Sequence, residues 1–219
     1  MLRDIAANVR TAPREVLVVY DFDEDDTVPV VERLQAEMPD LRAHRNRVGR
    51  GVLNAIKAGF SAARAPHVLV MMADGSDEAN VIDGMVALAE AGADVVSASR
   101  YMPGGRQEGG PPLKRTLSRI AGLTLHWFGG VPTHDPTSNF KLYSRRLLDA
   151  VRIESLGGFE LAIELTVKAH LLGMSVRELP TTWHDRTAGE SRFQMRKWIP
   201  QYMRWYLRGL QGRLMWWKK

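Results

Sequence analysis

The sequence predicts an α/β fold with a mostly parallel sheet flanked by helices. Short runs rich in β-branched residues, at 15–20, 67–72 and 94–99, alternate with amphipathic segments. This alternation is typical of βαβ units, in which a helix connects two parallel strands. A charged residue also closely follows each run, and open parallel sheets bind their ligands beyond the carboxyl ends of their strands.

Each expected element rests on its local pattern. The strand EVLVVY at 15–20 is followed by a helix through about Leu34. The later expected elements are a helix at 51–64, the strand HVLVMM at 67–72, a helix through about Glu90, the strand DVVSAS at 94–99, helices at 113–128 and 159–172, a strand at 175–180 and a helix from about Pro200. Glycine-containing polar stretches at 102–112 and 183–193 are typical of loops.

Three strand ends point to one crevice, because Asp21, Asp74 and Arg100 each follow a strand. Across a small turn, Asp77 adds a second carboxylate to Asp74, and such a pair suits a hard cation beside a phosphate. The alternative is that the two acids form a polar turn and cap the next helix.

The stretch at 102–112 holds four glycines and three prolines in eleven residues, so we expect a mobile loop without regular structure. Basic residues surround it, namely Arg100, Arg106, Lys114, Arg115 and Arg119. Such a loop suits closure over a phosphate, and a simple spacer is the alternative.

Composition excludes several classes of protein. The 219 residues suit one large domain, and without cysteine there is no disulfide scaffold, thiolate zinc site, iron–sulfur cluster or cysteine nucleophile. The cytoplasm is therefore the expected compartment. No signal peptide or apolar span is apparent, so we expect a soluble or peripheral protein. No serine lies in a nucleophile-elbow pattern, which disfavours hydrolases.

The net charge of +5 is concentrated at the C-terminal end, where residues 191–219 hold eight Lys or Arg and no acid. Four of the six tryptophans fall between 198 and 217. On a helix from Pro200, one apolar stripe contains Met203, Tyr206, Leu210, Leu214 and Trp217. This segment, 199–219, packs on its own domain or lies at a membrane interface. Nucleic-acid binding is disfavoured, because no such motif accompanies the charge.

Four segments in order, HVLVMMADGSD, SASRYMPGG, HDPTSNFKLY and DRTAGESRF, resemble family 2 glycosyltransferases of the dolichol-phosphate mannose synthase type. The resemblance covers about residues 15–205. It implies a GT-A-like fold over 1–198. It also implies inverting transfer of a sugar from a GDP- or UDP-sugar to a polyprenyl phosphate or related acceptor, by an enzyme peripheral to the cytoplasmic face of a membrane.

The resemblance also implies roles for individual residues. Asp74 matches the second acid of an Asp-x-Asp motif that holds Mg²⁺ or Mn²⁺, and Asp77, outside that motif, is the candidate second ligand because of its place in the same turn. Asp21, Gly49 and Gly51 match donor-binding positions. The phosphate-binding candidates are Arg100, Arg119, Arg186 and Ser191. A polyprenyl phosphate needs little general-base help because its oxygen is already anionic. If the acceptor is a hydroxyl, Asp135 or Glu164 becomes the candidate base.

The sequence departs from the family pattern at two places. Met72 replaces the first acid of Asp-x-Asp, and a thioether cannot bind a hard cation in its place. The start, MLRDIAANVR, lacks the family's first strand and its nucleotide-binding turn, so we expect an N-terminally truncated fold. The alternative function is a non-catalytic domain that binds the acceptor or membrane without turnover.

Overall fold

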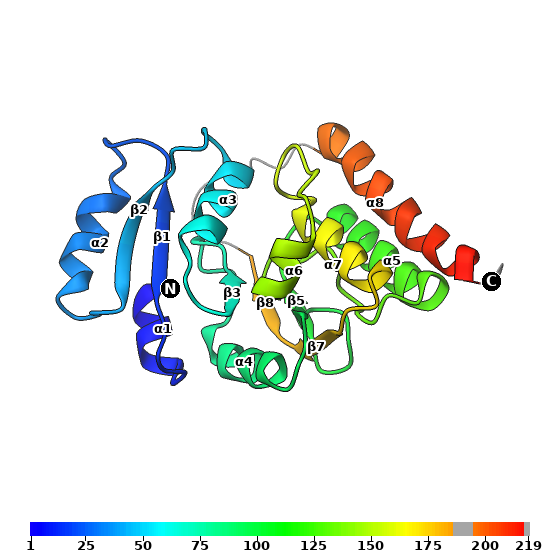
Figure 1. The fold of residues 1–219 in the computed structure, drawn as a ribbon, viewed down its shortest axis with the longest axis horizontal. Coiled ribbons are helices and arrows are strands. Elements are labelled where there is room, and N and C mark those ends of the chain that lie inside the picture. The colour runs from blue at the N-terminus through cyan, green and yellow to red at the C-terminus, as the bar shows by residue number, and fades with distance from the viewer. Residues whose placement is uncertain (186–194, 217–219) are drawn as a thin grey trace.

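The computed structural model describes residues 1–185 and 195–216, and it confirms an α/β architecture (Figure 1). The helices are α1 (Leu2–Asn8), α2 (Thr27–Gln35), α3 (Val52–Ala62), the 3-10 helix η1 (Ala79–Val81), α4 (Ile82–Glu90), α5 (Pro112–Gly129), α6 (Arg145–Ala150), α7 (Leu161–Leu171) and α8 (Met195–Trp216). The strands are β1 (Val16–Tyr20), β2 (Leu41–Arg45), β3 (His67–Val70), β4 (Val95–Ser99), β5 (Arg106–Glu108), β6 (Lys141–Ser144), β7 (Val176–Pro180) and β8 (Thr182–His184).

The strands of the described residues form three sheets. β1 pairs with β2, and β5 pairs with β8, in both cases in parallel. The central sheet has the order β3-β6-β4-β7, and β6 runs antiparallel to both of its neighbours. The expectation of a mostly parallel sheet is therefore only partly correct. The reason is that β6 follows α5 and a turn rather than a simple crossover helix, and so enters the sheet from the opposite end.

The core lies on both faces of the central sheet. Val96 and Ala98 of β4 pack against α4, whereas Val95 packs on the other face with α3 and α7. This alternation is the two-residue period of a strand. All residues of β4 and β6 are buried, and Met85 of α4 and Leu165 of α7 are fully buried beside them. The sheet is thus a rigid base for the residues that follow its strands.

Several elements differ from the sequence expectations. The stretch at 102–112 is not wholly irregular, because β5 lies within it. The C-terminal helix begins at Met195 and continues through Pro200, so the expected boundary between 198 and 199 falls inside a helix. The strands β2 and β6 and the short helices α1 and α6 were not expected.

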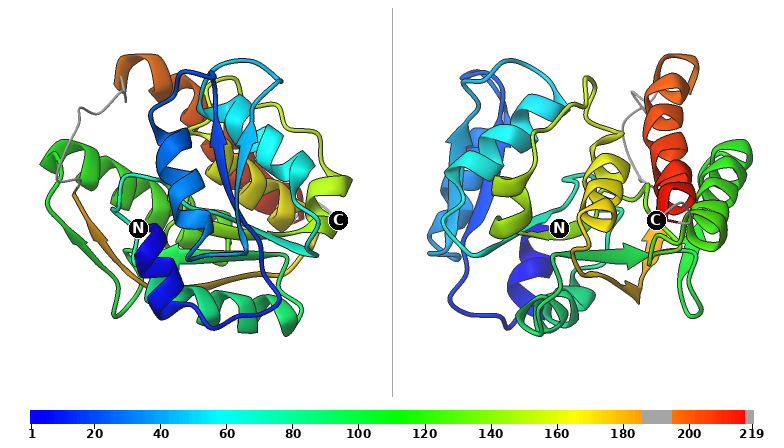
Figure 2. Two further views of the ribbon diagram at one scale, coloured as in Figure 1. Left: turned by 90° about the vertical axis from the view of Figure 1, so that its left-hand side faces the viewer. Right: turned by 45° about the vertical axis from the view of Figure 1, so that its right-hand side comes forward.

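The helices α5, α7 and α8 form a layer at one end of the molecule (Figure 2). Trp205 of α8 is 1% exposed and packs with Leu125 and Ile163. Tyr206 and Leu210 of the predicted apolar stripe also pack here, whereas Met203 is exposed. This helix therefore packs on its own domain, which is one of the two arrangements that the sequence analysis proposed for it.

Candidate functional site

The turn after β3 carries the first acidic candidate. Asp74 Oδ1 accepts hydrogen bonds from the backbone N–H (3.2 Å) and the hydroxyl (2.6 Å) of Ser76. Gly75 has a φ of 73°, which glycine adopts without steric cost. The Ser76 carbonyl accepts a hydrogen bond from His184 N–H at 3.0 Å, which joins the turn to β8. The polar turn considered above is thus present, and it holds Asp74 in place at the strand end.

The second acid, Asp77, is 8% exposed and accepts a long hydrogen bond of 3.5 Å from Met72 N–H. Burial raises the pKa of Asp77 to about 7, and the charge of Asp74 acts in the same direction. A bound cation would offset both the cost of burying a charged Asp77 and its repulsion by Asp74. No cluster of three or more His, Asp or Glu suited to a metal occurs in the described part of the chain. Two carboxylates still fit Mg²⁺ or Mn²⁺, because Mg²⁺ commonly takes one or two carboxylates together with substrate phosphates and water.

A buried ion pair lies close to this turn. Arg100, at the end of β4, donates from Nε to Asp135 Oδ2 (2.7 Å) and from a terminal nitrogen to Oδ1 (2.9 Å). The Arg100 side chain is 13% exposed and that of Asp135 is 0% exposed. Burial would raise the pKa of Asp135, but the charge and hydrogen bonds of Arg100 outweigh it and hold this pKa below its ordinary value. Asp135 therefore serves to orient a guanidinium group, which does not favour it as a general base.

Lys141 completes this network and was missed by the sequence analysis. It lies on β6, is fully buried, and donates from Nζ to Ser97 Oγ (2.8 Å) and to the carbonyls of Asp135 (2.7 Å) and Ser138 (2.8 Å). Burial lowers the pKa of Lys141 to about 7, against the opposing charge of Asp135. Lys141 lies in HDPTSNFKLY, one of the four family-like segments, which could have marked it as a candidate. Its burial, however, follows from its place on β6, which the sequence analysis did not predict.

The expected donor-binding residues form a second cluster after β1. Asp21 accepts hydrogen bonds from Asn46 Nδ2 (2.7 Å) and from the N–H of Gly51 (2.8 Å). Asn46 also donates to the carbonyl of Gly49 at 2.6 Å. Gly49 and Gly51 have φ values of 140° and 109°, so the turn requires glycine at both positions. The structure thus unites Asp21, Gly49 and Gly51 through Asn46, which the sequence analysis did not single out.

The two loops expected near the site are joined. β5, within 102–112, pairs with β8, and His184 of β8 contacts Glu78 and Glu108, each at 3.1 Å. The hydrogen bond to Glu78 is the main cause that raises the pKa of His184. Arg186 and Ser191 lie outside the described residues, so their expected roles remain predictions.

Two candidates remain. Arg119 is exposed on α5, and its charge acts on Tyr101, so it lies near the Arg100 pair. Glu164 of α7 is fully buried, and so is Glu160, which directly precedes that helix. The Glu164 carboxylate accepts hydrogen bonds from the N–H groups of Glu154 (2.6 Å) and Ser155 (2.7 Å) and pairs with Lys168 (2.7 Å). These contacts hold the loop before α7, and they do not favour Glu164 as a base.

Comparison with known proteins decides the family. The profile described as Glycosyl transferase family 2 matches residues 1–152. The chain belongs to this family. The polyprenol monophosphomannose synthase of Mycolicibacterium smegmatis is 32% identical to this family 2 glycosyltransferase over 208 residues, which cover 91% of the chain and 77% of the relative. A dolichol-phosphate mannosyltransferase of Pyrococcus furiosus is 27% identical, with 87% of this chain and 53% of that protein covered.

A solved structure supports the same conclusion for the fold. The glucosyl-3-phosphoglycerate synthase of Mycobacterium tuberculosis, crystallised with Mn²⁺, UDP-glucose and phosphoglyceric acid, superposes with a TM-score of 0.63 and 17% identity. The match covers 97% of this chain and 72% of that chain. This family 2 glycosyltransferase therefore has a GT-A-like fold, as the sequence predicted. Its acidic turn, its buried Arg100 pair and its glycine turn all follow strands of that fold.

Proposed function

We propose that this glycosyltransferase transfers a sugar from a nucleoside diphosphate donor to a polyprenyl phosphate, with inversion at the anomeric carbon. The observation that carries the proposal is the closeness of opposite charges at the strand ends. Arg100 and Asp135 both act electrostatically on Asp77, so the acidic turn and the guanidinium group share one site. Such a site suits a reaction between two phosphate-bearing substrates.

In this proposal Asp74 and Asp77 hold Mg²⁺ or Mn²⁺ against the donor diphosphate. The metal, when bound, offsets the negative charge that develops on the departing nucleoside diphosphate. Asp21 and the glycine turn at 49–51 bind the nucleoside side of the donor. Support for the metal and the donor comes from the Mn²⁺ and UDP-glucose complex of the structural neighbour, and from the chemistry of the two carboxylates.

Arg100 is the proposed contact for the acceptor phosphate. Its guanidinium group is held by Asp135 and contacts the Tyr101 ring at 4.8 Å, so it is oriented before substrate binds. Two relatives are named as enzymes of polyprenol and dolichol phosphates, which supports a polyprenyl phosphate acceptor here. The acceptor oxygen is already anionic, so no base is required.

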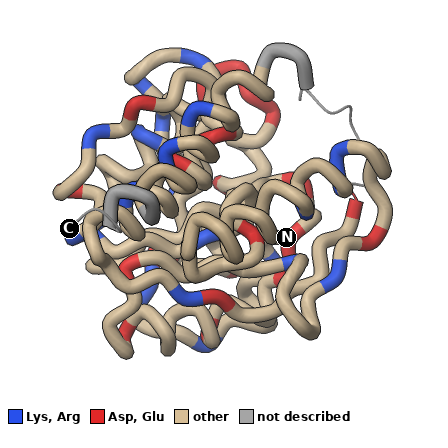
Figure 3. The backbone as a smooth tube through the Cα atoms, turned by 90° about the vertical axis from the view of Figure 1, so that its right-hand side faces the viewer, with Lys and Arg blue, Asp and Glu red and all other residues tan. Residues whose placement is uncertain are grey.

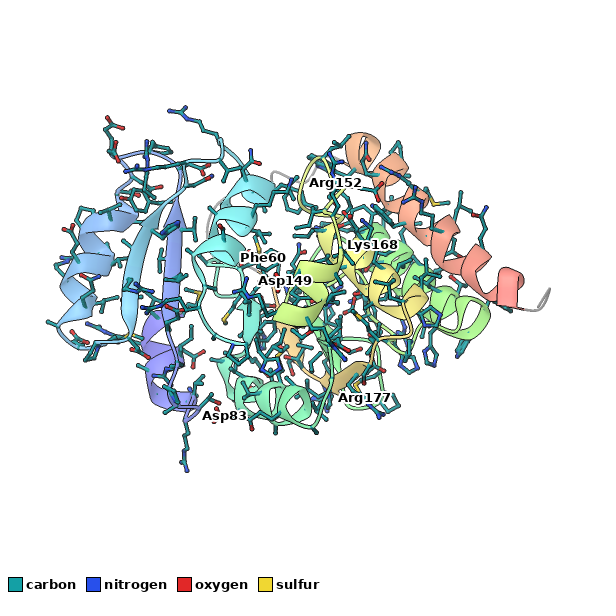
Figure 4. The ribbon with its side chains drawn as sticks, viewed as in Figure 1. Phe60, Asp83, Asp149, Arg152, Lys168 and Arg177 are labelled. Carbon is teal, nitrogen blue, oxygen red and sulfur yellow. The ribbon has the colours of Figure 1, made fainter. Side chains whose placement is uncertain are left out.

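The test compares Asp74→Asn with Asp149→Asn, an exposed acid on α6 (Figure 4). Each protein is incubated with GDP-mannose or UDP-glucose and polyprenyl phosphate in detergent, with Mn²⁺ or with EDTA, and the lipid product is measured by mass spectrometry. We expect Asp74→Asn and EDTA each to lower turnover by about 10²–10³-fold, with Asp149→Asn unchanged. Equal turnover by both variants contradicts the metal assignment. Donor binding by the wild type without product favours the non-catalytic alternative.

We also propose that the enzyme acts at a membrane surface, through a face formed by α5 and α8. The exposed apolar side chains of this face are Leu113, Leu117, Ile120, Trp127 and Phe128 on α5, and Ile199, Met203 and Leu207 on α8. Thr124 of α5 and Tyr206 of α8 are hydrogen-bonded at 2.9 Å, which brings the two stripes together. None of the helices described here has the length and apolar character to cross a bilayer. An interfacial position at the cytoplasmic face is the arrangement we propose.

The basic residues near this face suit anionic headgroups. Lys114, Arg115 and Arg119 flank the α5 stripe. On the other side of α8, Arg204 and Arg208 pair with Glu154, and charges of both signs are interspersed over this side of the molecule (Figure 3). Among the basic residues whose side chains the structure describes, those of α5 are therefore the ones we propose to attract lipid.

Vesicle co-sedimentation tests this placement. Deletion of α8 would expose the core around Trp205, so point variants are preferable. We expect Leu117→Gln together with Phe128→Ser to lower binding to anionic vesicles at least about fivefold, because apolar burial drives interfacial binding. Leu156→Gln is the matched control, since Leu156 is 74% exposed but lies in the loop before α7. Equal losses from both proteins would reject the face.

A further inference from the structure

A surface groove between α3, α7 and α8 lies outside the proposed active site. It consists of two neighbouring hollows of about 610 and 430 Å³, which share Arg152 and Glu154 as lining residues. Neither hollow is lined by Arg100 or by an acid of the proposed metal and donor sites. Among the described residues, Glu154 is the one acid that lines the two hollows, and the cations that line them are Lys57, Arg152, Lys168, Arg204 and Arg208. We call the two hollows the basic groove.

Two fully buried carboxylates hold the loop that forms one wall of the basic groove. Glu164 accepts hydrogen bonds from the N–H groups of Glu154 (2.6 Å) and Ser155 (2.7 Å). Glu160 accepts hydrogen bonds from the next two N–H groups along the loop, at 2.8 and 2.9 Å. Four consecutive backbone donors are therefore satisfied within the protein. The wall is thus held in one conformation before any ligand binds.

The buried ring of Trp205 supports the cations on the α8 side of the basic groove. Three cations lie over this ring, 4.7 to 5.1 Å from its centroid, namely Lys168, Arg204 and Arg208. All three also pair with Glu154. The hydrogen bond from Lys168 is the main cause that lowers the pKa of Glu154, and the other two charges act in the same direction. These cations are therefore held in place, and they outnumber their shared partner.

The two remaining cations of the basic groove have no acidic partner. Lys57 of α3 is partly buried, and Arg152 is exposed between α3 and α8 (Figure 4). Neither side chain forms an ion pair with any residue that the structure describes. Together with Arg204 they bring three positive charges, from three separate elements, to the larger hollow. Like charges repel one another at this range, and an anion in the hollow would offset the repulsion.

The loop that forms the wall also contacts both parts of the proposed active site. A Cβ on Gly158 would lie 2.6 Å from the backbone nitrogen of Leu53, so the loop packs directly on the first turn of α3, which follows the donor-binding glycine turn. The carbonyl of Phe159 accepts a hydrogen bond from the Tyr202 hydroxyl, and the charge of Arg100 acts on Tyr202. A ligand in the basic groove would therefore lie against a loop that contacts both parts of the site.

We propose that the basic groove binds the phosphate or diphosphate group of a ligand other than the donor and the acceptor. Guanidinium groups bind phosphate oxygens in bidentate fashion, and they stay charged. The volume of the larger hollow is within the range of small-molecule sites. The phosphate belongs either to a solute or to a lipid headgroup. We expect a solute, because none of the exposed apolar residues of the α5–α8 face lines the groove.

An NMR titration of the whole chain with inorganic pyrophosphate tests the proposal. EDTA is present, so that no metal ion holds pyrophosphate at the acidic turn. We expect the largest chemical-shift changes at the backbone amides of 152–156 and at the Nε–H groups of Arg152 and Arg204. Lys57→Gln together with Arg152→Gln should weaken binding at least about tenfold, because two charge-assisted contacts are lost. Neither residue pairs with an acid among the described residues, so this variant should fold.

The matched control is Arg33→Gln together with Arg177→Gln, which removes the same amount of charge. Both arginines are exposed, and they lie on α2 and β7 (Figure 4). We expect this control to weaken binding by less than about twofold, because distant surface charges are screened. Equal weakening by the two double variants would show a general effect of net charge and would overturn the site. Largest shifts at Arg100 or at 74–77, or no saturable shift, would overturn it too.

Co-sedimentation with phosphatidic acid vesicles identifies the carrier of the phosphate. We expect the wild type and the Lys57→Gln, Arg152→Gln variant to bind vesicles equally, which supports a solute. A loss of at least about fivefold in this variant, absent from the Arg33→Gln, Arg177→Gln control, would support the site with a lipid headgroup as its ligand. No measurement here requires turnover. Failure of the phosphate site is therefore distinguishable from failure of the proposed function.

Discussion

The two-stranded sheet of β1 and β2 and the four-stranded sheet around β4 differ in how completely they are enclosed. All five residues of β1 are partly exposed, whereas all residues of β4 and β6 are buried. The Arg100–Asp135 pair depends on the buried strands β4 and β6, whereas the acidic turn follows β3, which is partly exposed, and the glycine turn at 49–51 follows the open sheet. We therefore expect Arg100 and Asp135 to be more rigidly preorganised than the glycine turn at 49–51.

The largest expected effect concerns the buried ion pair of the enclosed sheet. Asp135→Ala leaves Arg100 buried without its partner, so we expect a loss of about 3–5 kcal/mol in the free energy of unfolding. Urea unfolding measures this loss, and Asp149→Ala on the surface of α6 should change it by less than about 0.5 kcal/mol. A loss below about 1 kcal/mol for Asp135→Ala would show that Arg100 remains hydrated and that the site is less enclosed.

A matched pair of leucines compares the two sheets directly. Leu142 of β6 is 2% exposed, and Leu17 of β1 is partly exposed. We expect Leu142→Ala to cost about 2–5 kcal/mol, because a cavity forms in an enclosed core, and Leu17→Ala to cost less than about 1.5 kcal/mol. Thermal or urea unfolding of both variants gives the difference. Equal costs would mean that β1 is packed as tightly as the central sheet.

The smallest expected effect is an acid dependence at the edge of the enclosed sheet. Asp94 accepts hydrogen bonds from Ser144 Oγ (2.8 Å), Arg146 Nε (2.9 Å) and Ser175 N–H (3.0 Å). Burial would raise the pKa of Asp94, but these partners outweigh it and hold the pKa below its ordinary value.

A lowered pKa in the folded state means that the stabilisation is present above the ordinary pKa and is lost as the pH falls through the folded value. We expect Asp94→Asn to cost about 1–3 kcal/mol at pH 7, with the difference shrinking below about pH 4. Unfolding curves of both proteins from pH 7 to pH 3 measure it. A difference that stays constant with pH would show that Asp94 contributes packing alone.

The difference between exposed and enclosed strands also explains which elements the sequence could predict. The runs of β1, β3 and β4 are apolar and β-branched, and these strands, together with β7, were expected close to their observed bounds. β2 is an edge strand with the sequence LRAHR, and its charged residues interrupt the apolar pattern from which a strand is predicted. β6 contains the buried Lys141, a residue type that is almost never fully buried unless paired. β6 also runs antiparallel to its neighbours because of tertiary connections, which no local sequence pattern predicts.

The site residues likewise divide into those that the sequence indicated and those that only the structure reveals. Asp74 and Arg100 could be expected to lie near one another because each ends an apolar run of the central sheet, and Arg100 does act electrostatically on the turn of Asp74 and Asp77. Their binding roles, and that of Asp21, stay predictions. The Asp135 carboxylate was identified as a candidate base, yet its contacts with Arg100 give it an orienting role. Asn46 and Lys141 act through partners distant in the sequence, Asp21 and Ser97, so only the folded chain reveals them.

Gly122 of α5 has a mechanical consequence. A Cβ at this position would lie 2.1 Å from the carbonyl oxygen of His134, so helix and turn are in direct backbone contact. The helix presents its apolar side to the surroundings and its glycine to the turn that carries Asp135. Tightly packed interiors transmit displacement, so a tilt of α5 against a lipid surface would move the turn and, through Asp135, the guanidinium group of Arg100. In the membrane arrangement proposed above, α5 would therefore couple the lipid surface to the position of Arg100.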